Sequence, residues 1–134
     1  MLPSKKQLKQ LANYLVETVI PDCPAGFTMN PYNREFPLFL KDQYVVALKE
    51  YEKRLLYPIK IGEVFSWLCT NAHAFENRFV GGWHDSETNE YVLDVSIAIT
   101  GEQEAKDFGL LNTQTHIYSQ YFDKEIPLTE KKAA

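Results

Sequence analysis

Three residue types that can cooperate in hydrolysis occur in one part of the sequence, as His84, Asp94 and Ser96. A serine nucleophile needs a base that takes its proton and a carboxylate that orients the base. Ser96 falls in the middle of a predicted strand, where the strained turn and the oxyanion hole of a nucleophilic serine are not expected. We therefore expect no catalytic residue, and a small hydrolase that uses these side chains is the third of our functional hypotheses.

Metal and cofactor chemistry has little support in the sequence. Cys69 and His73 stand four residues apart on a predicted helix and could offer two zinc ligands, but no second pair with ligand spacing exists. Cys23, His84 and His116 would have to converge from separate elements. Glycine-rich phosphate loops and the common zinc and serine-hydrolase motifs are absent from the sequence. We expect no metal site and no cofactor.

The segment 79–100, FVGGWHDSETNEYVLDVSIAIT, carries the strongest pattern in the chain. Apolar residues alternate from Tyr91 to Ile99, which predicts a half-buried strand, and the polar loop 85–89 before it predicts a hairpin. This loop would place Trp83 beside Tyr91 as a cross-strand aromatic pair on the core face. A loop one residue longer or shorter would turn Trp83 to the opposite face.

The opposite face of this strand carries Asp94 and Ser96, and two interpretations of it are open. In the first, the face simply meets solvent. In the second, Gly81 and Gly82 mark the close approach of another backbone or a ligand. The small side chains would then leave a shallow depression in which Asp94 and Ser96 accept hydrogen bonds from a bound group. Both interpretations turn these two side chains outward.

The other elements are predicted from periodicity and turn residues. Helical spacing of apolar residues predicts three helices, at 4–20, 61–75 and 101–109. Further strands are predicted at 27–30, from 43 to about 50, and at 115–122. The stretch 43–56 also fits a helix. We expect a single α+β domain, residues 1–134, with an antiparallel or mixed sheet of about five strands and three helices packed on it.

The charge and hydropathy of the chain exclude several classes of partner. The 134 residues include 14 basic and 18 acidic side chains, for a net charge of −4. Nucleic-acid binding depends on basic surfaces that neutralise phosphates, and the sequence has no basic stripe, so we expect no direct nucleic-acid contact. No apolar run has the length of a membrane span, and the start does not look like a secretory signal. We expect a cytoplasmic protein with no membrane contact.

Four stretches together resemble a pattern in small uncharacterised proteins of bacteriophages and prophages: GGWHDSETNEYVLDVSIAIT, EQEAKDFG, NTQTHIYS and EIPL. The pattern has a Gly-Gly-Trp hairpin, a Tyr-x-x-Asp-x-Ser strand and an Asn-x-Gln segment that leads into a strand. The resemblance covers about residues 79–128 and implies an origin in a phage or mobile element, with the host cytoplasm as location. It marks six binding positions: Trp83, Asp85, Tyr91, Asp94, Ser96 and Gln114.

The first functional hypothesis is a non-enzymatic protein that binds a host protein as an inhibitor of a host defence system. Acidity, abundant aromatic residues, small size and the phage-like pattern favour it. The alternative is a nucleotide-binding module in which Trp83 or Tyr91 stacks on a base and Asp94 accepts a hydrogen bond from it. A homo-oligomer is also open, because the predicted 115–122 strand could lie at a sheet edge and pair with another copy.

Overall fold

The structure is a computed structural model, and it is described here for residues 2–128. Its helical elements are α1 (Lys5–Tyr14), the π-helical turn η1 (Leu15–Val19), α2 (Ile20–Asp22), α3 (Ile61–Asn71), the 3-10 turn η2 (Ala72–Phe75) and α4 (Glu102–Leu111). Its strands are β1 (Gly26–Met29), β2 (Gln43–Leu56), β3 (Phe79–Asp85), β4 (Glu90–Thr100), β5 (His116–Ser119) and β6 (Lys124–Pro127). The predicted α+β class is confirmed, with a sixth strand that the sequence did not reveal.

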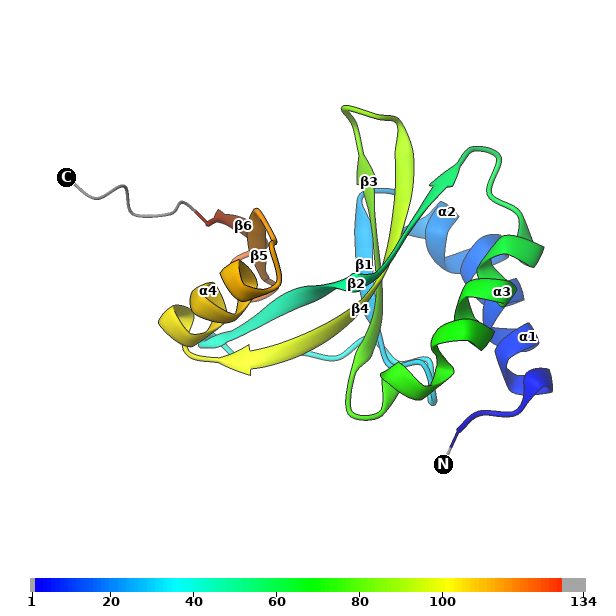
Figure 1. Ribbon diagram of the computed structural model, residues 1–134, viewed down its shortest axis with the longest axis horizontal. Coiled ribbons are helices and arrows are strands. Elements are labelled where there is room, and N and C mark those ends of the chain that lie inside the picture. Colours follow the sequence, from blue (N-terminus) through cyan, green and yellow to red (C-terminus); the bar gives the residue numbers. More distant parts are fainter. Residues whose placement is uncertain (1, 129–134) are drawn as a thin grey trace.

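The strands form one antiparallel sheet in the order β1-β3-β4-β2-β5-β6. The stretch 43–56 is a strand along its whole length, so its helical interpretation is wrong. β2 and β4 pair over most of their length and form the long twisted ribbon that crosses the middle of Figure 1. β5 lies between β2 and β6, so the predicted edge strand is an inner strand of the sheet.

The helices cover one side of the sheet, called here the helix face. The predicted core side of β4 is confirmed there, because Tyr91, Leu93 and Val95 are fully buried in the main apolar cluster with α1 and α3. The strand is not half-buried as predicted, because residues 91–96 are buried on both faces. At the other end of the ribbon α4 covers a second, smaller cluster, which consists of Tyr44, Val46, Ala105 and Ile117. Figure 1 shows the two helical groups at opposite ends of the β2–β4 ribbon. Within residues 2–128, no helix is both long and apolar enough to cross a bilayer.

A bulge interrupts the pairing of β2 with β4 for four residues of β2 in the middle of the ribbon. The register passes from Leu48 opposite Val95 to Lys53 opposite Leu93, so Asp94 faces the looped-out residues 49–52. The Trp67 indole N–H of α3 donates to the Tyr51 carbonyl at 2.7 Å and holds this bulge toward the helices. Bulges bend a strand and increase its twist, which agrees with the twisted ribbon of Figure 1.

A long connection crosses the side of the sheet that the helices leave open. Residues 30–42, named here the strap, contain no helix or strand and join β1 to β2. The Phe39 ring of the strap is buried and meets the Phe79 ring edge to face, with 5.4 Å between centroids. Phe79 pairs with Ser96 in the β3–β4 register. The strap therefore covers the face that carries Ser96, called here the strap face.

Candidate functional site

Asp94 and Ser96 lie on the strap face but are buried, with only 5% and 3% of their surface exposed. The expectation that they turn outward is therefore wrong. The Ser96 hydroxyl donates to Asp94 Oδ1 at 2.5 Å, so the two polar groups satisfy each other inside the protein. Gly81 pairs with Asp94 across the strands, and a Cβ at this glycine would collide with the carboxylate. In one interpretation of the sequence, the two glycines are a sign that a backbone or a ligand approaches closely. At Gly81 the group that approaches is the Asp94 side chain of the neighbouring strand.

Burial raises the pKa of Asp94 to about 6, because the charged carboxylate has lost its hydration. The hydrogen bond from Ser96 opposes this shift, and the negative charge of Glu52 in the bulge adds to it. Glu52 is itself paired with Lys49 at 3.1 Å and with Arg54 at 3.5 Å. No basic side chain among residues 2–128 forms an ion pair with Asp94. The Asp94–Ser96 pair is thus a polar part of the core, out of reach of a substrate.

The hairpin turn is one residue shorter than predicted. Asp85 pairs with Glu90, and the four residues between them form the turn. Trp83 consequently lies opposite Val92 rather than beside Tyr91, so the predicted aromatic pair is wrong. Because the side-chain direction alternates along a strand, the shift by one residue moves Trp83 to the strap face.

Arg54 organises the charged end of the hairpin. Its guanidinium lies over the Trp83 ring, 5.9 Å from the ring centroid, and leaves less of the indole for a ligand. Arg54 Nη1 donates to Asp85 Oδ2 at 2.9 Å and to Glu90 Oε1 at 3.2 Å. The hydrogen bond from Arg54 lowers the pKa of Asp85. Both Trp83 and Asp85, predicted as binding residues, are thus engaged by one arginine of β2.

Tyr91 is fully buried on the helix face and pairs with His84 across the hairpin. Its ring cannot stack on a ligand, and burial raises the pKa of its hydroxyl. That hydroxyl has no hydrogen-bond partner in the described part of the chain. His84 shares the helix face with Tyr91, whereas Ser96 and Asp94 lie on the strap face. The fold therefore does not assemble the three side chains that a hydrolase would need.

The last predicted binding residue, Gln114, connects two elements of the fold. Its Nε2 donates to the Ala47 carbonyl at 2.9 Å and ties the connection between α4 and β5 to β2. Among residues 2–128, no three His, Cys, Asp or Glu side chains gather as metal ligands, and Cys23 and Cys69 are free thiols. The six predicted residues are thus distributed over both faces of the sheet and do not form one site.

The strap exposes apolar side chains that the sequence analysis did not single out. Phe36, Leu38 and Leu40 are exposed, and they alternate with the half-buried Pro37 and the buried Phe39. Leu38 is 94% exposed. The strap thus turns one side toward the sheet and presents a row of apolar side chains on the other.

Gln120, in the turn between β5 and β6, fixes the strap in place. Its Nε2 donates to the Pro37 carbonyl at 2.6 Å, and its Oε1 accepts from Phe39 N at 2.7 Å. The next two residues, Tyr121 and Phe122, are also exposed, and their rings are in contact with 5.0 Å between centroids. Together these side chains form the apolar patch, defined as Phe36, Leu38, Leu40, Tyr121 and Phe122.

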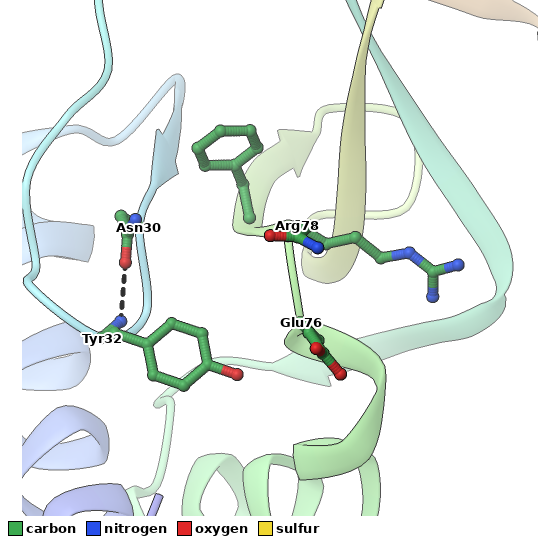
Figure 2. A pocket seen from close by; sticks show the side chains of 6 residues that line it. Asn30, Tyr32, Glu76 and Arg78 are labelled. Carbon is green, nitrogen blue, oxygen red and sulfur yellow. Dashed lines mark hydrogen bonds between the residues drawn. The ribbon is translucent and has the colours of Figure 1, made fainter. Parts of the chain in front are cut away.

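A shallow cleft lies at the other end of the strap, with a volume of about 570 Å³. It is lined by Asn30, Tyr32, Glu76, Asn77, Arg78 and Phe79. Figure 2 shows that the Tyr32 hydroxyl is directed toward Glu76, whereas the Arg78 guanidinium extends away from Tyr32. Asn30 Oδ1 accepts from Tyr32 N at 2.8 Å, the dashed line in Figure 2, and fixes the start of the strap. We name this feature the Tyr32 cleft.

One sequence signal could have indicated the strap. The run FPLFL, residues 36–40, is apolar but contains a proline and is too short for a helix. Such a run is either core or an exposed surface, and only the contact with Gln120, about 80 residues later, decides between them.

No family model matches the chain, and no curated protein and no solved structure matches it.

Proposed function

We propose that the protein acts by binding another protein through the apolar patch, without catalysing a reaction. The observation that carries this proposal is the fixed exposure of the patch. Five large apolar side chains stand in solvent on segments that Gln120 hydrogen-bonds together. The largest apolar patch on a soluble protein is often the place where a partner binds.

The size of the patch supports a protein partner. Large side chains contribute on the order of 100 Å² each when about half or more of the side chain is exposed, which gives roughly 500 Å² for the patch. A standard interface buries about 800 Å² on each partner. The patch would therefore supply more than half of such an interface, with polar residues at the rim supplying the rest.

The alternative functions have less support from the geometry. Nucleotide binding at the hairpin would need Trp83 or Tyr91 for stacking and Asp94 as an acceptor. Tyr91 and Asp94 are buried, and Arg54 lies over the Trp83 ring. Hydrolysis would need His84 next to Ser96, and these side chains lie on opposite faces of the sheet. The net charge of −4 and the phage-like pattern favour a finer proposal, in which the partner is a host protein that belongs to a defence system.

The test compares three tagged proteins: the wild type, Leu38→Ala and Leu56→Ala. Leu56 is also well exposed but lies at the far end of β2 from the strap, so it is the matched control. Each protein captures partners from a lysate of the source cells, and the affinity for any stoichiometric partner is then measured by calorimetry. Full burial of a leucine contributes roughly 1.5–3 kcal/mol, so Leu38→Ala should weaken binding by about 10- to 100-fold.

Leu56→Ala should bind like the wild type. A partner that binds Leu38→Ala as tightly as the wild type would refute the patch as the interface, and so would the repeated recovery of no partner. The identity of the partner tests the finer proposal: a component of a defence system supports it, and an unrelated housekeeping protein contradicts it.

A further inference from the structure

The Tyr32 cleft lies on the same strap as the apolar patch. Its walls come from two parts of the chain. One is the start of the strap with Asn30 and Tyr32, and the other is the segment 76–79 that leads from η2 into β3 and includes Arg78. The cleft is shallow and open to solvent, with a volume of about 570 Å³, so a side chain bound there would stay partly in water. A partner that covers the strap would therefore meet the patch at one end and this cleft at the other.

Two charged side chains line the cleft, the Glu76 carboxylate and the Arg78 guanidinium. Glu76 is exposed, and it has no ion-pair partner among residues 2–128. Neither Arg78 nor Arg34 forms an ion pair with Glu76. Arg78 Nη1 donates to the Ala74 carbonyl at 3.3 Å and extends away from Tyr32 in Figure 2. The Arg34 guanidinium lies over the Tyr14 ring of α1, 5.5 Å from its centroid.

Aromatic rings line the cleft beside this carboxylate. Tyr32 is exposed at one wall, and Phe79 is half-buried at another. The faces of aromatic rings attract cations, and a carboxylate adds a charge-assisted hydrogen bond to the same ligand. A planar guanidinium can stack on a ring and donate two hydrogen bonds in one plane, which an ammonium group cannot do.

We infer that the Tyr32 cleft binds an arginine side chain of the partner protein, with Glu76 as the anion and Tyr32 as the stacking surface. This inference rests on the proposed function for the existence of the partner, but the cleft itself can be tested on the isolated protein. The inference predicts two features of the partner. It has an apolar surface that contacts the apolar patch, and it has an arginine that reaches the Tyr32 cleft at the other end of the strap.

The experiment is an NMR titration of the ¹⁵N-labelled full chain with N-acetyl-arginine amide. N-acetyl-citrulline amide serves as the matched probe, because it has nearly the same shape and no charge. The arginine probe should shift the backbone amide signals of Asn30, Tyr32 and Asn77 and saturate in the millimolar range. Citrulline should bind at least about tenfold more weakly, since it lacks the charge-assisted hydrogen bond.

Two variants complete the test. Glu76→Gln keeps the shape of the cleft and should weaken arginine binding by about tenfold, whereas Leu38→Ala should leave it unchanged. Four outcomes would overturn the inference. The two probes bind equally, Glu76→Gln binds arginine as tightly as the wild type, the shifts are confined to residues outside the cleft, or no shift is seen. If arginine binds as expected but Leu38→Ala does not weaken capture of a partner, the cleft stands and the proposed function of the patch fails.

Discussion

Replacing Asp94 by asparagine should make the stability of the protein less dependent on pH. Asp94 is buried between β3 and the bulge of β2, with Ser96 as its hydrogen-bond donor and Glu52 nearby. Asparagine has the same shape and keeps an oxygen that can accept from Ser96, but it does not ionise. The variant therefore removes the titration of this group and retains most of the packing.

The magnitude follows from the pKa values. The carboxyl pKa is about 6 in the folded protein, against an ordinary value of 3.8. This difference of about two pKa units corresponds to roughly 3 kcal/mol. Below pH 3.8 the acid is protonated in both states and does not lower the stability. As the pH rises from about 4 to 6 the unfolded chain loses its proton first, so the free energy of unfolding falls, and above pH 6 the loss is complete.

Urea unfolding, followed by tryptophan fluorescence between pH 4 and pH 7.5, measures this effect. The free energy of unfolding of Asp94→Asn, minus that of the wild type, should rise by about 2–2.5 kcal/mol between pH 4 and pH 7, because part of the total change has already occurred at pH 4. Using the difference between the two proteins cancels the titration of all other groups. A difference that stays constant over this range would refute the reasoning, because Asp94 would then have an ordinary pKa in the folded state.

Asp85→Asn is the matched control and should show the opposite sign. Arg54 lowers the pKa of Asp85, so the stability that this carboxylate contributes is present above its ordinary pKa and is lost as the pH falls through the lowered folded value. The loss of stability caused by Asp85→Asn should therefore stay nearly constant above about pH 4 and shrink below pH 3.8, so this control is also measured below pH 3.8. The same direction for both variants would show that the pH dependence does not come from burial at Asp94.

Three further substitutions test the packing around the sheet and the strap. Gly81→Ala should destabilise the protein by about 1–3 kcal/mol in urea unfolding, because its Cβ would enter the space of the Asp94 carboxylate; an unchanged stability would contradict this contact. Gln120→Ala should release the strap, lower the free energy of unfolding by about 1–3 kcal/mol and speed hydrogen exchange at the Phe39 amide. If the Phe39 amide exchanged as slowly as in the wild type, Gln120 would not be the anchor of the strap. Tyr91→Phe removes a buried hydroxyl that has no partner in the described residues, so the melting temperature should stay the same or rise, and a clear fall would reveal a hidden partner.

The local pattern of the sequence predicted the elements better than their relative placement. Alternation from Tyr91 to Ile99 correctly indicated β4 and its core side, because that side packs on amphipathic helices that are visible in the sequence. The register of the hairpin was wrong by one residue, because it depends on the geometry of the turn, where Asn89 takes a left-handed φ of 55°. A turn shorter by one residue reverses the face of Trp83, and residue types alone do not fix this length.

The candidate site could not be predicted, because distant segments decide which residues are exposed. Asp94 and Ser96 have the polarity of solvent-facing residues, but the sheet and the strap bury them, and their hydrogen bond makes this burial tolerable. Conversely, Leu38 has the character of a core residue and is nearly fully exposed. Its position depends on the two hydrogen bonds that Gln120 makes from the far end of the chain.

The two apolar clusters cannot belong to two independently folding halves of the chain, because β2 and β4 each run from one cluster to the other. A chain that stopped before α4 would leave Val46 and its neighbours uncovered on a bare two-stranded ribbon, which is hardly stable in water. Uncovered strands of this kind recruit strands from other molecules and precipitate. The segment from α4 onward therefore covers the end of the ribbon, and chains shortened before α4 should accumulate in the insoluble fraction of expressing cells.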